Sequence, residues 1–235
     1  MALAFYLINL QDFAIQTSLV PPRDRVVGIL LGLLMMWLVF DQLWSAPTAA
    51  QMRKTFTSLF RLLAQLATES LSDAQSVAIA RSFALRETIN GRFNQVRALA
   101  DGVWFEFGPS RQRDLALRSR ILGWQAQLRI LFVSCVTLLK YRLQVPDFEL
   151  PEAARLAQQD FEECLARTLD RMADRLEGKA DEDTQSLQAG LARLKESVLI
   201  SDAGKAQANE TARVQTFLAL SERITGLAVS LGKAI

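Results

Sequence analysis

Hydrophobic residues are arranged in two different ways along this chain. From Val26 to Trp44 they form a nearly continuous run that contains one charged residue, Asp41. Beyond residue 47 they recur every three or four positions among charged residues, which is the spacing of amphipathic helices. The pattern predicts an all-α chain with a membrane segment over residues 1–46 and a domain of long amphipathic helices over residues 47–235.

The apolar run predicts one full transmembrane helix over residues 25–44. Its 19 residues from Val26 to Trp44, at about 1.5 Å per residue, roughly match a hydrocarbon core of about 30 Å. Basic residues precede it, and Phe40 and Trp44 lie at its other end, where aromatic side chains favour the membrane interface. The alternative is a helix buried in the core of a soluble protein. The apolar segment that precedes the run favours the membrane.

Residues 1–20 predict part of a second membrane helix, because they contain too few apolar residues to span a bilayer alone. Asn9, Asp12 and Gln16 are spaced so that they share one face of this helix. A carboxylate in an apolar helix is costly unless it faces protein or water. Two interpretations stay open. Asp12 lines a substrate or proton path with Asn9 and Gln16, or it lies solvated at the membrane surface.

Three short motifs occur where the membrane segment continues. The Pro21–Pro22 pair is expected to end the partial helix. Gly28 and Gly32 form a G-x-x-x-G spacing, which allows transmembrane helices to pack closely and predicts a homo-oligomer or a neighbouring helix. Arg23 and Arg25 are predicted either to attract an anionic substrate or to anchor the span at lipid headgroups. Basic residues near the two ends of the span are similar in number, with a slight excess that favours a cytoplasmic C-terminal domain.

The domain after residue 47 is predicted to be a bundle of helices. One stripe at helical spacing consists of Phe56, Leu59, Phe60, Leu63 and Leu66. The next helix is expected to run past Ile79, Phe83, Ile89, Phe93 and Val96 to about Ala100. The predicted helices begin near Pro47, Asp73, Ser110, Pro151, Thr184 and Ala206. The polar stretch over residues 178–187 predicts a mobile linker, and Gly178 is expected to end the helix before it.

Two stretches of this domain differ from the rest. The loop Gly102–Ser110 contains Trp104 and Phe105, and its aromatic content predicts a loop that is docked against protein. The stretch Ile130–Leu139 is apolar on all sides, which predicts a core helix buried by its neighbours. Its ten residues, bracketed by basic residues, are too few for a membrane span.

Composition and charge restrict the function further. The 235-residue chain has 27 basic and 25 acidic residues, and this near balance argues against a nucleic-acid-binding protein. It has no histidine, the commonest general base and metal ligand, and no phosphate-binding loop, dinucleotide fingerprint or metal-ligand cluster. We therefore expect no enzymatic activity, no cofactor and no metal. Cys135 and Cys164 lie in apolar helical contexts, which favours packed, reduced thiols over a disulfide.

The run Asn9–Trp44 resembles the fusaric-acid-resistance family of inner-membrane exporters, which includes the aromatic-acid and multidrug-resistance exporters of Gram-negative bacteria. The most specific part of the resemblance is Arg23–Gly32, RDRVVGILLG. The downstream stretch Phe105–Arg111, FEFGPSR, is also similar to the cytoplasmic region of this family.

The resemblance implies a proton-driven efflux transporter in the bacterial inner membrane. Its partners would be the lipid bilayer, other transmembrane helices of the exporter, a periplasmic adaptor and an outer-membrane channel. It also implies a last transmembrane helix that leads into a cytoplasmic helical domain. Members of the family usually have several more transmembrane helices, so the chain looks like the C-terminal portion of an exporter. The alternative is a membrane-tethered helical scaffold that binds other proteins without transporting anything.

Overall fold

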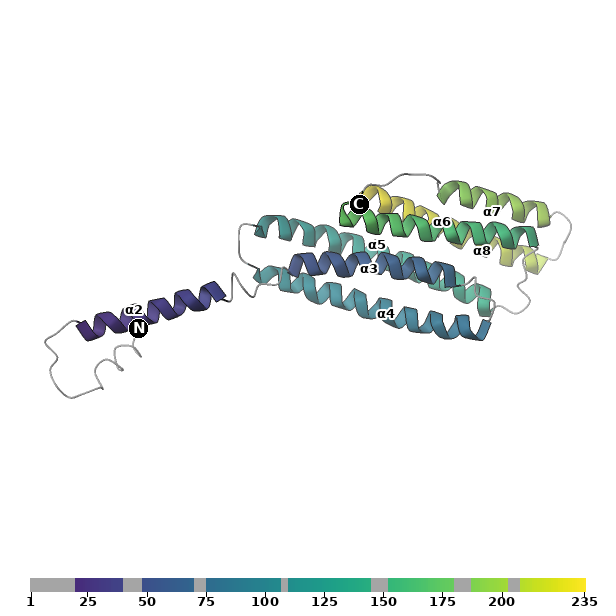
Figure 1. Ribbon diagram of the computed structural model, residues 1–235. Coiled ribbons are helices and arrows are strands. Elements are labelled where there is room, and N and C mark those ends of the chain that lie inside the picture. The colour runs from purple at the N-terminus through teal and green to yellow at the C-terminus, as the bar shows by residue number, and fades with distance from the viewer. Residues whose placement is uncertain are drawn as a thin grey trace. The chain divides into compact units, whose positions relative to one another are not determined.

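The computed structural model describes residues 20–39, 48–69, 75–106, 110–144, 152–179, 187–202 and 208–235. Within these ranges every regular element is helical and no strand occurs, so the all-α prediction is confirmed for the described residues. The chain separates into two compact units, Met1–Pro47 and Thr48–Ile235. The first unit contributes one described helix, and the second forms a helical bundle (Figure 1).

The first unit contains α2, which runs from Val20 to Trp37 over 18 residues. Pro21 and Pro22 lie in its first turn, where proline fits because the amide hydrogens there have no intrahelical acceptor. The predicted boundary is therefore wrong: the prolines belong to this helix, which begins before the expected residue 25. Leu38 and Val39 continue it as a wider π turn. The rest of the predicted span, residues 40–44, lies outside the described residues.

The second unit is a bundle in which successive helices run in alternating directions (Figure 1). Short connections between long helices favour this antiparallel arrangement. The longest helix has 34 residues, which corresponds to about 51 Å. The described elements are α3 (Thr48–Thr68), α4 (Gln75–Gly102), the 3₁₀ turn η3 (Val103–Phe105), α5 (Arg111–Gln144), α6 (Glu152–Glu177), α7 (Leu187–Asp202) and α8 (Ala208–Ala234).

Helix α3 occupies the middle of the bundle. It packs against α4, α5 and α6, while α8 packs against α5, α6 and α7. The stripe predicted for α3 is confirmed, because all five of its residues are at most 2% exposed. Phe56 makes an edge-to-face contact with Phe60 (ring centroids 5.3 Å apart) and stacks on Trp124 of α5 at 6.3 Å. These aromatic contacts join α3 to α5 at the centre of the core.

Helix α5 differs from its prediction as a wholly buried helix. Leu131, Phe132 and Cys135 are buried, but Ile130 and Val133 are 46% and 56% exposed. The helix therefore buries one face and leaves an apolar stripe uncovered among the described residues. The reason is that α5 packs mainly against α8 and α3.

By length and composition, one helix among the described residues qualifies as a membrane span, and it is α5, over Arg111–Tyr141. The apolar stretch Ile130–Leu139, which the sequence assigns to a core helix, lies inside this longer window. Half of the most apolar 18-residue window of α5 is buried inside the bundle, which is also typical of the core helix of a soluble protein.

The end of α6 follows the prediction for Gly178. This glycine has φ of +80°, in the left-handed region that favours glycine. Its amide hydrogen-bonds to the carbonyl of Arg175, and the amide of Lys179 bonds to the carbonyl of Asp174, both at 3.0 Å. This pair of bonds is the Schellman arrangement, which satisfies carbonyl groups at the end of a helix.

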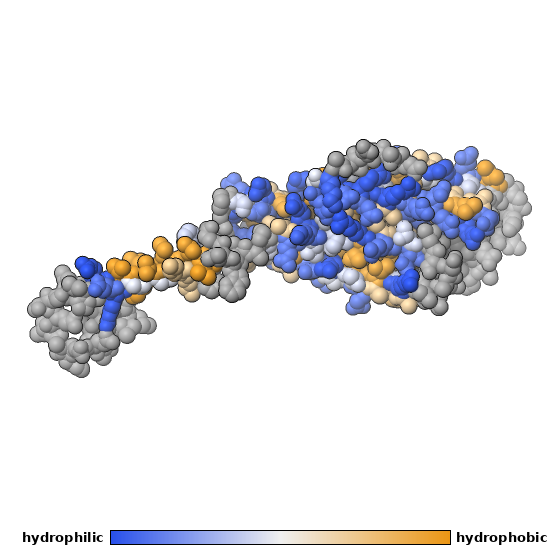
Figure 2. All heavy atoms as spheres, viewed as in Figure 1, coloured by the Kyte–Doolittle hydropathy of each residue, from blue (hydrophilic) through white to orange (hydrophobic). Residues whose placement is uncertain are grey.

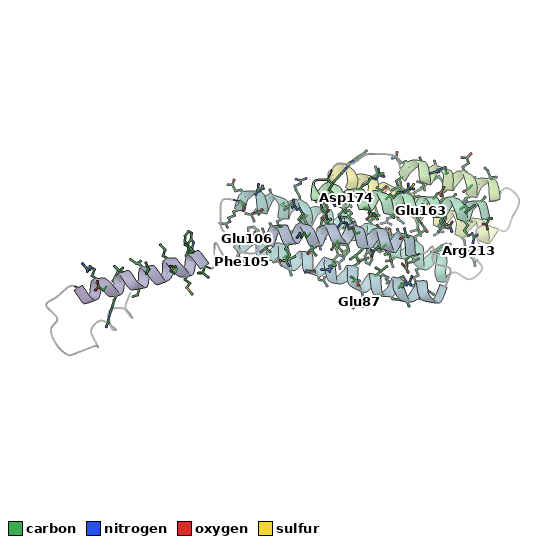
Figure 3. All side chains as sticks on the ribbon, viewed as in Figure 1. Glu87, Phe105, Glu106, Glu163, Asp174 and Arg213 are labelled. Carbon is green, nitrogen blue, oxygen red and sulfur yellow. The ribbon has the colours of Figure 1, made fainter. Side chains whose placement is uncertain are left out.

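The loop after α4 is less docked than its aromatic content predicts. Val103 is buried, but Trp104 and Phe105 are 51% and 77% exposed. Arg118 of α5 lies over the Trp104 ring, 4.8 Å from its centroid. The carboxylate of Glu106, labelled in Figure 3, accepts a hydrogen bond from the amide of Thr48 at the start of α3. An acidic group is favourable at this end of a helix because of the helix dipole.

Candidate functional site

The outstanding chemical feature of α2 is an apolar surface on every side of the helix. Twelve large hydrophobic side chains between Val26 and Val39 are each 37–60% exposed. Figure 2 shows hydrophobic residues along the visible face of this helix. Contiguous exposed apolar surface of this kind marks a membrane or protein interaction site.

The described part of α2 is short for a complete membrane span. Its uncharged stretch, residues 26–39, has 14 residues, or about 21 Å of helix. A hydrocarbon core of about 30 Å needs the further residues 40–44 that the sequence supplies. The transmembrane assignment over residues 25–44 therefore stays a prediction.

The charged residues at the start of α2 are paired with one another. Nε and Nη2 of Arg23 both lie 3.3 Å from Oδ1 of Asp24. The two side chains are 71% and 63% exposed, so this ion pair contributes little to stability. Asp24 nevertheless offsets the charge that Arg23 would present to an anion, and Arg25, the next residue along the helix, is also exposed. Headgroup anchoring and substrate attraction therefore both stay predictions for Arg23 and Arg25.

Gly28 and Gly32 lie four residues apart on one face of α2. A methyl group added to either glycine would meet no atom within 4 Å. This face therefore has room for a second helix to approach closely, as the G-x-x-x-G spacing predicts. The predicted packing partner stays a prediction.

The other predicted site residues, Asn9, Asp12 and Gln16, lie outside the described residues. The structure thus brings Arg23, Arg25, Gly28 and Gly32 together on one helix. Their relation to the polar stripe of residues 1–20 rests on the sequence alone.

Among the described residues of the bundle, one carboxylate is buried in the interior. Glu162 of α6 is 4% exposed and accepts a 2.8 Å hydrogen bond from Nε2 of Gln158. Burial, and then the charge of Glu162, raise the pKa of the Cys135 thiol to about 12. Such a thiol stays protonated and unreactive at neutral pH. Among the described residues, no buried side-chain polar atom lacks a hydrogen bond and no group of residues is arranged to hold a metal ion.

Sequence reasoning missed a cavity between α4 and α5. Its volume is about 250 Å³. Phe83 of α4, one of the apolar residues along this predicted helix, is 55% exposed at the cavity. The sequence signal was present in two basic residues beside the apolar positions. The cavity is lined by Ile79, Ser82, Phe83, Arg86, Val136, Leu139 and Lys140.

Comparison of the chain with protein-family models gave no match, and comparison with the curated proteins also gave none.

Proposed function

We propose that this chain is an inner-membrane component of a proton-driven efflux transporter for aromatic acids or drugs. The observation that carries the proposal is the apolar surface on all sides of α2, over Val26–Val39. The sequence resemblance at Arg23–Gly32 connects this helix to exporters. In this proposal α2 lies in the lipid bilayer and the bundle Thr48–Ile235 lies in the cytoplasm.

The proposed mechanism is alternating access coupled to the proton gradient. Asp12 changes its protonation state during the cycle, because an ionisable residue in an apolar segment serves best as a proton carrier. Asn9 and Gln16 offer hydrogen bonds to the polar group of the substrate. Gly28 and Gly32 supply the close contact with a neighbouring helix of the exporter or with a second copy of the chain.

The test is a resistance assay in the source bacterium after deletion of the gene. We expect the deletion strain to be more sensitive to fusaric acid and the wild-type gene to restore resistance. Asp12→Asn should fail to restore it although the protein reaches the membrane in equal amount. The matched control is Asp24→Asn, which makes the same chemical change in an exposed ion pair and should restore resistance fully.

Two results would contradict the proposal at different points. If deletion leaves sensitivity to aromatic acids and drugs unchanged, transport is refuted. If Asp12→Asn restores full resistance, Asp12 is removed from the mechanism while transport stands.

A membrane-tethered scaffold is the second candidate. It is favoured by the bundle itself, whose described residues have satisfied polar groups in the interior and ion pairs at the surface. Such a bundle offers long helix surfaces to other proteins. A deletion strain with unchanged resistance, together with a membrane-bound chain that retains specific protein partners, would favour this function.

A further inference from the structure

The cavity between α4 and α5 combines an apolar floor with two cations. Ile79 and Phe83 of α4 and Leu139 of α5 supply apolar surface, and Ser82 and Val136 complete the wall. The α4 residues are spaced i, i+3, i+4 and i+7, so they lie on one helix face. The α5 residues follow the same rule. The cavity is thus built from two rigid helix faces, which are better supports for a binding site than loops.

Arg86 and Lys140 supply positive charge from the two helices. The guanidinium of Arg86 lies over the Phe83 ring, 5.2 Å from its centroid. This contact orients Arg86 without neutralising its charge. Among the described residues, no ion pair of Arg86 or Lys140 occurs, and the contact of Arg86 is with the Phe83 ring. Glu87, labelled in Figure 3, follows Arg86 on α4 and is exposed. The described lining of the cavity therefore carries two positive charges and no negative one, beside exposed apolar surface.

From this geometry we propose that the cavity is a binding site for a small amphipathic anion, with a compact apolar body and one carboxylate. The volume of about 250 Å³ is slightly below the range of about 300–1,000 Å³ for drug-sized ligands, so it suits a body of one or two rings. The apolar body covers Phe83 and Leu139, and the carboxylate lies between Arg86 and Lys140. An arginine guanidinium matches a carboxylate particularly well, since it can donate two parallel hydrogen bonds.

The inference goes beyond the proposed transport function and does not depend on it. Binding here is a property of the bundle, whereas transport is assigned to α2 and Asp12. Failure to bind at this cavity would leave the resistance assay unaffected, and loss of resistance would say nothing about this cavity.

Equilibrium dialysis of the full chain in phosphatidylcholine nanodiscs tests the proposal, with empty nanodiscs as the reference for partitioning into lipid. The probe is 2-naphthoate. We expect saturable binding of about one molecule per chain, and at least tenfold weaker binding of 2-naphthalenemethanol, which has the same rings without the charge. Acetate, which has the charge without the rings, should not compete. Equal binding of the alcohol and the acid would overturn the assignment of an anion site.

Variants locate the binding. Arg86→Gln/Lys140→Gln should weaken 2-naphthoate binding at least tenfold. The matched control, Lys54→Gln/Arg97→Gln, removes the same charge from exposed positions of α3 and α4 and should change the affinity less than twofold. Equal affinities of these two double variants would overturn the proposal.

A third variant tests the volume independently of charge. Val136→Trp fills the cavity from its half-buried wall and should weaken binding at least fivefold. Unchanged affinity in this variant would place the ligand elsewhere. Complete loss of 2-naphthoate binding in discs that contain anionic phosphatidylglycerol would identify a lipid as the occupant and would also overturn the proposal.

Discussion

Replacing Leu31 and Leu34 by arginine would place two charges in the middle of the apolar run of α2. Both side chains are more than half exposed in the described structure, at 60% and 55%. They therefore face lipid if α2 spans the membrane. The variant Leu31→Arg/Leu34→Arg tests directly whether this helix lies in lipid or in water, because charged side chains are tolerated in water and costly in hydrocarbon.

The size of the effect follows from the composition of the helix. Residues 26–39 contain nine leucine, isoleucine and valine residues. The seven that remain in the variant favour insertion by about 2–4 kcal/mol in total, at roughly 0.3–0.6 kcal/mol each. Two central arginines oppose insertion by about 5–7 kcal/mol. The opposing term is larger than the favourable one, so we expect the double variant to lose its membrane attachment.

The assay is extraction of bacterial membranes with alkaline carbonate, followed by detection of the chain in pellet and supernatant. Wild type should stay in the pellet and the double arginine variant should move to the supernatant. The matched control Leu31→Ala/Leu34→Ala loses only about 1 kcal/mol of apolar contribution and should stay in the pellet. Retention of the arginine variant at the wild-type level would refute the reasoning, and so would a wild-type chain that is extracted by carbonate.

Four further outcomes follow from the bundle. Phe56→Ala should lower its stability by about 3–5 kcal/mol in urea titrations followed by circular dichroism, whereas Phe105→Ala, at a residue 77% exposed, should change it by less than about 0.5 kcal/mol. Gly178→Ala should cost about 1 kcal/mol in the same titration because of its positive φ, and an unchanged midpoint would argue against the left-handed cap. Val133→Arg on the exposed stripe of α5 should leave the carbonate-resistant fraction unchanged; its loss would show that α5 contacts lipid. The Cys135 thiol, with its pKa raised to about 12 by burial, should react with a disulfide reagent at pH 8 only after denaturation; rapid labelling of the native bundle would contradict its burial.

The helices and most of their buried faces were predictable because they depend on local pattern. The stripe of α3 shows this well, since Phe56 and its partners at helical spacing are all buried. The stop at Gly178 was predictable for the same reason, because glycine is strongly favoured just beyond the end of a helix.

The periodicity of the sequence did not predict which helix faces are covered by a neighbouring helix. Phe83 and Val133 have the sequence context of core residues, yet each is more than half exposed. Periodicity says which residues share a helix face and leaves open whether another helix covers that face. The cavity beside Phe83 arises from this difference. The predicted site residues Asn9, Asp12 and Gln16 lie outside the described residues, so their role stays a prediction.

The hydrogen bond from Thr48 to Glu106 joins the first residue of α3 to the turn that follows α4. These residues are 58 positions apart in the chain. The chain enters the bundle at Thr48. A pulling force applied to the residues before Thr48 would therefore act on the first turn of α3 and, through this hydrogen bond, on the turn between α4 and α5. The start of α3 should therefore resist unwinding under such a force better than the end of a helix that has no such bond.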